Sequence, residues 1–163
     1  MNKCSGYGRL LAGLALLLLL VSGQAVLADD GLSEKQVGRY TRETVKKNFT
    51  DVVADVEFAI SQFNYRLTGR NRVGASIAEM DGEKFKEATV LHFCNTQAAK
   101  EILAIDSSYL LHMPCRITVR ERLEDNAVVV DARLLTEADP AMLEVARRVN
   151  KMMRDIVNYA VQD

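Results

Sequence analysis

The sequence predicts an α+β domain with helices packed on one face of a mainly antiparallel sheet, in the order β-α-β-β-α-β-β-α. Apolar residues recur at helical spacing in residues 50–63 and again in residues 140–160. Two β-rich segments, residues 115–123 and 127–135, are separated only by a short turn of acidic and amide residues. Such a turn predicts an antiparallel hairpin, and helices interspersed with strands of this kind cover one sheet face.

The first 28 residues have the composition of a secretory signal peptide. Lys3 and Arg9 precede an apolar run over residues 10–21, and small residues lead to Ala28. We expect cleavage after Ala28 and a periplasmic or secreted protein. The alternative is an uncleaved membrane anchor, but the apolar run is shorter than the roughly 20 residues that a spanning helix needs.

Charge and cysteine content limit the classes of partner. The chain has 21 basic and 22 acidic residues, and losing Lys3 and Arg9 leaves 19 against 22, a net charge of −3. This balance argues against nucleic acid, whose binding needs a basic face, and against a polybasic membrane patch. Cys94 and Cys115 remain in the mature chain, where an oxidising compartment would permit a disulfide.

The mature chain is expected to begin with a leader, a strand and a helix. Residues 29–44 are a polar leader that includes a candidate first strand, and residues 45–163 form the domain. Thr50 suits the cap of a helix whose apolar stripe runs to Phe63.

An extended segment and a turn follow this helix. Residues 65–77 are predicted to be extended, and either Gly69 or Gly74 could mark a bend or bulge. Residues 80–83 have turn composition.

The stretch from 85 to 123 holds both histidines and both remaining cysteines. Residues 85–93 predict a strand, Asn95 the cap of a short helix over residues 98–103, and residues 107–113 a loop. Because side chains alternate across a strand, His92 should share a face with Cys94. By the same alternation, the strand that begins at Cys115 turns its arginines to the face opposite that cysteine.

The final helix is predicted to be long enough to cover a whole sheet. Asp139 suits its cap and Pro140 its first position, where the missing N–H costs nothing. Its apolar stripe contains methionines that we interpret as core filling.

Several of these pieces resemble one family, the domain of unknown function 302 family (DUF302). They are Cys94-Asn95, the helix over residues 98–103, and Met113-Pro114-Cys115 running into a strand. The likeness covers most of residues 45–163. It implies a small α+β domain that associates into homodimers, and it implies no activity, substrate or catalytic residue.

The sharpest hypothesis for chemistry is a metal or haem site formed by His92, Cys94, His112 and Cys115. Imidazole and thiolate are ligands for zinc and copper, and a thioether from Met113 would suit Cu(I). The spacing matches no zinc-finger pattern, so the sequence leaves open whether the two pairs meet.

Three other readings use the same cysteines. Cys94 and Cys115 could form a structural disulfide, which would stabilise the fold by about 3 kcal/mol through closure of a loop of about 20 residues. They could instead be buried, unpaired thiols that pack as small hydrophobic groups. A reversible catalytic disulfide is the third reading, weakened by the lack of a C-x-x-C motif.

Arginines on one strand suggest a second candidate site. Arg116, Arg120 and Arg122 share a strand face and could bind an anion, or they could simply form a solvated outer surface. Hydrolase and nucleotide-binding motifs such as G-x-S-x-G and H-E-x-x-H are absent from the sequence. The sequence therefore predicts an exported domain that binds a small ligand or metal near Cys94 and Cys115, with thiol-based redox chemistry as the alternative.

Overall fold

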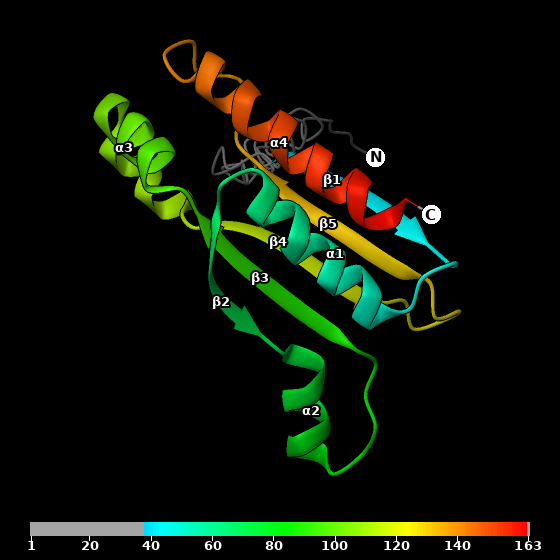
Figure 1. The fold of residues 1–163 in the computed structure, drawn as a ribbon. Helices are drawn as coiled ribbons and strands as arrows, with labels where there is room; N and C mark the ends of the chain where they lie inside the picture. Colours follow the sequence, from blue (N-terminus) through cyan, green and yellow to red (C-terminus); the bar gives the residue numbers. More distant parts are fainter. Residues whose placement is uncertain (1–37, 163) are drawn as a thin grey trace, which may run out of the picture. The chain divides into compact units, whose positions relative to one another are not determined.

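The computed structural model describes residues 38–162, so the predicted signal peptide, its cleavage site and the start of the leader lie outside the described residues. Figure 1 shows strands and helices following one another along the chain. In chain order the elements are β1 (Gly38–Thr44), α1 (Phe49–Gln62), β2 (Arg66–Asn71), α2 (Val73–Asp81), β3 (Ala88–Cys94), α3 (Thr96–Ile105), the 3₁₀ helix η2 (Ser107–His112), β4 (Cys115–Glu121), β5 (Val128–Leu134) and α4 (Leu143–Val161).

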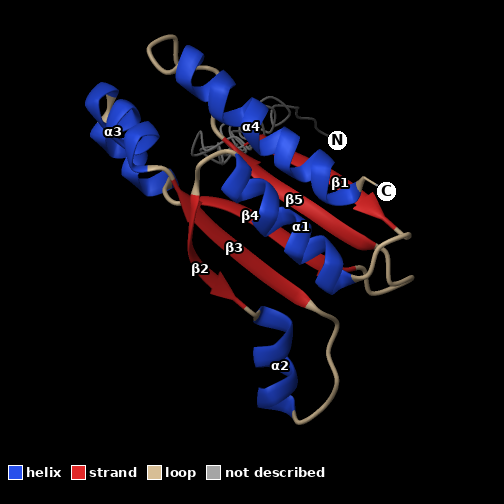
Figure 2. Cartoon of the chain, viewed as in Figure 1, coloured by secondary structure: helices blue, strands red, loops and turns tan. Residues whose placement is uncertain are grey.

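The strands form one antiparallel sheet in the order β1-β5-β4-β3-β2 (Figure 2). The predicted hairpin is confirmed, because β4 pairs with β5 along its length, with Thr118 opposite Asp131. The first strand is confirmed at the sheet edge, where β1 pairs with β5. The α+β class with an antiparallel sheet is therefore confirmed.

Helices α1 and α4 lie side by side on one face of this sheet, as Figures 1 and 2 show. The strand residues beneath them are fully buried, among them Leu91, Phe93 and Ile117, each 0% exposed. Burial of such side chains contributes about 1.5–3 kcal/mol each. The long final helix is confirmed, and Met152 and Met153 are buried in the core as expected. Within residues 38–162, no helix is both long and apolar enough to cross a membrane.

The predicted extended segment over residues 65–77 is wrong in its second half. Strand β2 ends at Asn71, and Val73 begins helix α2, which ends in Gly82 at a left-handed φ of 70°. Gly74 lies inside this helix and marks a close approach of two backbones. A Cβ built on it would lie 2.7 Å from the Ala88 amide nitrogen and closer still to the Lys86 carbonyl oxygen.

Replacing Gly74 with alanine is expected to destabilise the domain by about 1–3 kcal/mol. Alanine favours a helix over glycine by about 1 kcal/mol, but here the clash is with backbone atoms at the start of β3, which cannot rotate away. Denaturant unfolding measures the loss. Gly69→Ala is the control, because its nearest neighbour would lie 3.8 Å away, and equal losses in the two variants would contradict the packing argument.

Several predicted boundaries also need correction. Asn48 rather than Thr50 caps α1, because the Asn48 side chain accepts the Asp51 amide hydrogen at 3.0 Å. Asp139 caps only a separate turn, in which its side chain accepts the Ala141 amide hydrogen at 2.9 Å, and α4 begins afterwards at Leu143. The predicted loop over residues 107–113 is mostly the 3₁₀ helix η2.

Candidate functional site

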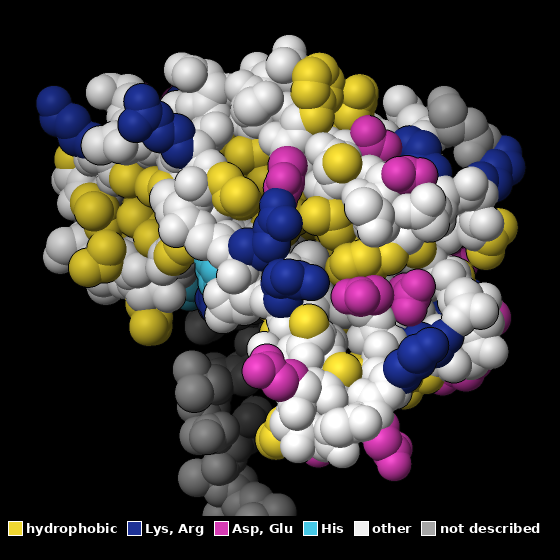
Figure 3. Space-filling view, turned by 60° about the horizontal axis from the view of Figure 1, so that its bottom comes forward, with side chains coloured by type: hydrophobic (Ala, Val, Ile, Leu, Met, Phe, Trp, Pro, Cys, Tyr) yellow, Lys and Arg dark blue, Asp and Glu magenta, His cyan; other side chains and the backbone are white. Residues whose placement is uncertain are grey.

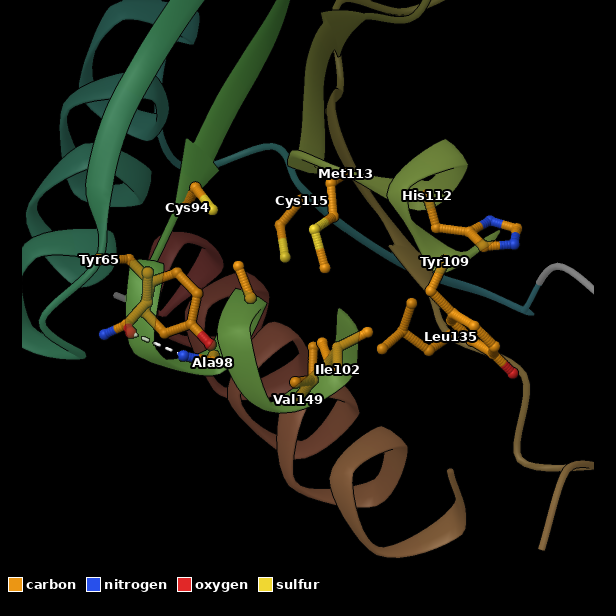
Figure 4. A pocket seen from close by; sticks show the side chains of 12 residues that line it. Tyr65, Cys94, Ala98, Ile102, Tyr109, His112, Met113, Cys115, Leu135 and Val149 are labelled. Atoms are coloured by element: carbon orange, nitrogen blue, oxygen red, sulfur yellow. Dashed lines mark hydrogen bonds between the residues drawn. The ribbon is translucent and has the colours of Figure 1, made fainter. Parts of the chain in front are cut away.

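A small apolar cavity lies where β3 ends and β4 begins, between these strand ends and helices α3, η2 and α4 (Figure 4). Its volume is about 30 Å³. Side chains from segments far apart in the sequence line it: Tyr65, Cys94, Ile102, Tyr109, His112, Met113, Cys115, Leu135 and Val149.

Asn95 sets the path of the chain after Cys94, the last residue of β3. Its side-chain oxygen accepts the amide hydrogens of Gln97 at 2.9 Å and Ala98 at 3.0 Å, which caps α3. Its side-chain nitrogen donates to the Asn64 carbonyl at 2.9 Å. The cap predicted at Asn95 is thus confirmed, and it anchors α3 directly beside the Cys94 thiol.

Cys115 is the first residue of β4 and pairs with Phe93 in register. It therefore lies on the inner face of the sheet with Ile117 and Val119, as alternation predicts. Burial raises the pKa of the Cys115 thiol to about 11, and the neighbouring Cys94 raises it further in the same direction. Cys115 is thus a neutral thiol at neutral pH.

Tyr65 closes one side of the cavity. Its ring packs edge-on against Phe93 at a centroid distance of 5.9 Å. Burial raises the pKa of Tyr65 to about 12, and Cys115 and then Cys94 add to this shift. The hydroxyl therefore stays protonated and can only serve as a neutral hydrogen-bonding group.

Asn150 of α4 holds the remaining wall of the cavity in place, and its side chain is buried, at 1% exposed. The Asn150 side chain accepts from the Leu135 amide at 2.8 Å and donates to the Leu135 carbonyl at 3.0 Å. These bonds fix Leu135 and the adjoining Val149 at the cavity. Leaving those two backbone groups without partners would cost roughly 1–3 kcal/mol each.

The Cys115 thiol is expected to react slowly with iodoacetamide in the native protein. Because the pKa is about 11 against an ordinary 9.0, the reactive thiolate is about 100-fold scarcer than for a free thiol at the same pH. Peptide mass spectrometry of timed samples measures the rate. After denaturation the rate should match that of a free cysteine, and a fast native reaction would contradict a buried, neutral thiol.

His112 reaches the cavity wall but turns its ring away from the cysteine sulfurs (Figure 4). The ring lies against Tyr109 at 5.5 Å, and its Nδ1 is 3.3 Å from a guanidinium nitrogen of Arg133. Burial, followed by the positive charges of Arg133 and Arg116, lowers the pKa of His112.

His92 does not line the cavity. It lies on β3 opposite Arg116 of β4 and Gly69 of β2, on the sheet face away from the buried Leu91 and Phe93. The structure thus brings together Cys94, His112 and Cys115 and leaves His92 on the other face. Among residues 38–162, no group of three or more His, Cys, Asp and Glu residues is placed to hold a metal ion.

Three sulfur atoms nevertheless face one space. Figure 4 shows the side chains of Cys94, Cys115 and Met113 directed toward the same cavity from β3, β4 and the segment between η2 and β4. Both cysteines are free thiols. Sequence reasoning identified these three residues, whereas Tyr65, Tyr109, Leu135 and Val149 were missed, since only tertiary packing brings them together.

The three arginines of the predicted row, Arg116, Arg120 and Arg122, do not all lie on one strand. Arg116 and Arg120 lie on β4, but Arg122 lies past its end and is held by Glu43 at 2.8 Å and Asp125 at 2.7 Å. The row is therefore not one continuous surface.

Comparison with known proteins identifies the fold but no activity. Residues 40–160 match the family model described as "Domain of unknown function DUF302". A solved structure described as an uncharacterized conserved protein DUF302 from Bacillus stearothermophilus is similar, with a TM-score of 0.64 and 16% identity over 76% of this chain and 98% of that chain. No curated protein matches the chain significantly.

Proposed function

Because the chain belongs to the DUF302 family, a family without an assigned function, we propose its function from the site alone: it binds one soft metal ion, Cu(I), through Cys94, Cys115 and Met113. The observation that carries this proposal is the convergence of three sulfur-bearing side chains on one apolar cavity. The family match supplies the fold that holds these side chains and says nothing about the ligand.

The size of the cavity favours an ion over an organic ligand. Its volume is about 30 Å³, whereas one water molecule requires about 10–15 Å³ by this measure and small-molecule pockets span roughly 300–1,000 Å³. A cavity of this volume has room for a single ion and not for an organic ligand.

The donor set favours Cu(I) over zinc. Thiolate and thioether are soft ligands, and Cu(I) is a soft first-row ion that both ligands select. A structural zinc site takes four nitrogen, sulfur or carboxylate ligands. The residues that line this cavity include two cysteines and no carboxylate, and the one histidine turns its ring away.

The affinity for Cu(I) is expected to rise with pH. The ion binds the thiolate, and the Cys115 thiol, with a pKa of about 11, is protonated at neutral pH. Binding therefore releases this proton, and the apparent affinity should rise by about tenfold per pH unit between pH 6 and 8 from Cys115 alone. Competition titrations at three pH values measure this slope, and an affinity independent of pH would exclude Cys115 thiolate as a ligand.

Competition with a chromophoric Cu(I) chelator, under anaerobic and reducing conditions, tests the proposal directly. The mature domain should withdraw one Cu(I) per chain from the chelator. Met113→Leu keeps the volume of the side chain and removes the thioether, so it should weaken binding. Met80→Leu is the matched control, because Met80 is 77% exposed and distant from the cavity lining. No withdrawal of copper, or equal effects of the two variants, would refute the proposal.

Thiol-based redox chemistry is the rival function at the same two cysteines. Oxidation would join the two sulfurs and remove two hydrogens, which requires an external oxidant. The raised pKa of Cys115 makes it a poor attacking thiolate. If the wild-type protein reduces a disulfide substrate with turnover and Cys115→Ser does so more slowly, the redox function would be favoured.

Export and self-association also remain proposals. The signal-like first 28 residues support a periplasmic or secreted location, which N-terminal sequencing of the mature protein tests.

Exposed apolar side chains on α3 and η2 support a homodimer: Ile105 is 42%, Leu110 62% and Leu111 80% exposed. Figure 3 shows hydrophobic side chains gathered at one end of the molecule. Light scattering that returns the monomer mass at micromolar concentration would exclude this dimer.

A further inference from the structure

A second hollow lies on the outer face of the sheet, across β1, β5 and β4. Its charged lining consists of Arg39, Arg116, Arg133 and Asp131, joined by the hydroxyl of Thr118. The volume is about 500 Å³, within the range of roughly 300–1,000 Å³ that small-molecule sites occupy.

The single carboxylate of this hollow is already engaged. Asp131 accepts the hydroxyl of Thr41 at 2.5 Å and pairs with Arg39 at 3.1 Å. Arg120 approaches its other oxygen at 3.7 Å. Arg39 and Arg120 thus already share the carboxylate of Asp131, and neither Arg116 nor Arg133 pairs with it.

Arg116 and Arg133 therefore carry positive charge that no carboxylate of residues 38–162 balances through an ion pair. Both side chains are only partly exposed. A guanidinium nitrogen of Arg133 lies 3.3 Å from His112 Nδ1, a contact that neutralises no charge. Two half-buried guanidinium groups without a carboxylate partner form a region suited to an anion.

We propose that this hollow binds a small molecule bearing a phosphate group, with Arg116 and Arg133 as its main donors. A guanidinium offers paired N–H groups whose geometry matches the oxygens of phosphate. The hydroxyl of Thr118, two residues from Arg116 on β4 and opposite Asp131 of β5, supplies a further donor. The site lies on the opposite sheet face from the buried thiol of Cys115 and does not depend on metal binding.

Calorimetric titration of the mature domain with inorganic pyrophosphate, in a buffer of about 0.1 M ionic strength that is free of phosphate, tests this site. Binding should saturate at one pyrophosphate per chain. Arg116→Gln and Arg133→Gln should each weaken it about tenfold or more, as expected for the loss of charge-assisted hydrogen bonds. Circular dichroism checks that each variant is folded.

Arg122→Gln is the matched control, because it removes the same charge from an arginine already held by Glu43 and Asp125. It should change pyrophosphate affinity by less than about twofold, since screening leaves little interaction between exposed charges beyond roughly 10 Å. Equal weakening by all three variants would mean nonspecific attraction and would overturn the proposal. So would the absence of saturable binding.

Two further arms separate the sources of the phosphate and the two sites. Binding to phosphatidylglycerol vesicles without binding to pyrophosphate would assign the face to a lipid surface and overturn a soluble ligand. Cys115→Ser should retain pyrophosphate binding, so failure of the copper site leaves this result intact.

Discussion

Cys115→Ser is expected to lower the affinity for Cu(I) by more than about 100-fold. Changes to residues that only support a metal ligand already cost about 10- to 100-fold, so loss of the ligand itself should exceed this range. Serine has nearly the shape of cysteine but presents a hard oxygen that Cu(I) does not prefer. Competition with a chromophoric chelator measures the affinities.

A thermal or chemical unfolding experiment supplies an independent readout of the same change. At a free Cu(I) concentration of 100 times Kd, the wild-type domain should gain about 2.7 kcal/mol of stability, and Cys115→Ser should gain almost none. Cys94→Ser should behave in the same way, because its side chain faces the same cavity. Full retention of Cu(I) binding by either serine variant would contradict a site built on both thiols.

Phe93→Ala is expected to destabilise the domain by about 3–5 kcal/mol, a large part of the 5–15 kcal/mol that holds most domains folded. Phe93 is 0% exposed, belongs to the core beneath the helices, and packs edge-on against Tyr65. Truncation to alanine leaves a cavity in the core and removes the ring contact with Tyr65. Urea unfolding at constant pH measures the free energy of unfolding.

Phe58→Ala is the matched control for this prediction. Phe58 is 51% exposed and contacts Tyr159 at a centroid distance of 5.7 Å. The same truncation there should cost no more than about 1–1.5 kcal/mol, mainly from the ring contact. Similar losses in the two variants would show that Phe93 is not the core residue that its burial indicates.

Much of the fold could be predicted because its strongest local signals agree with its tertiary packing. The stripe of α4 repeats over 19 residues from Leu143 to Val161, so the period of a helix is unmistakable. The hairpin of β4 and β5 likewise needs only a turn and two β-rich segments. Helix α2 was missed because Gly74 is a poor helix former whose value lies in contact with Lys86 and Ala88.

The candidate site was predictable only in part. Cys94, Met113 and Cys115 are adjacent to strand ends that the sequence indicates, so their meeting at one end of the sheet follows from the β3–β4 pairing. Alternation placed His92 with Cys94, yet Cys94 is the last residue of its strand and lies at the cavity while His92 remains on the outer face. Leu135, which follows β5, and Val149 of α4 reach the cavity through tertiary packing, and no local pattern indicates which segments this packing brings together.

A native mass spectrum of residues 29–163, reduced and equilibrated with a Cu(I)–chelator complex, decides whether the sulfur-lined cavity binds copper. We expect one copper per chain, with the mass of the displaced thiol protons missing, and no copper on Cys115→Ser. A bare polypeptide at every copper concentration would contradict it. So would copper that binds wild type and Cys115→Ser alike, since the ion would then lie outside the sulfur-lined cavity.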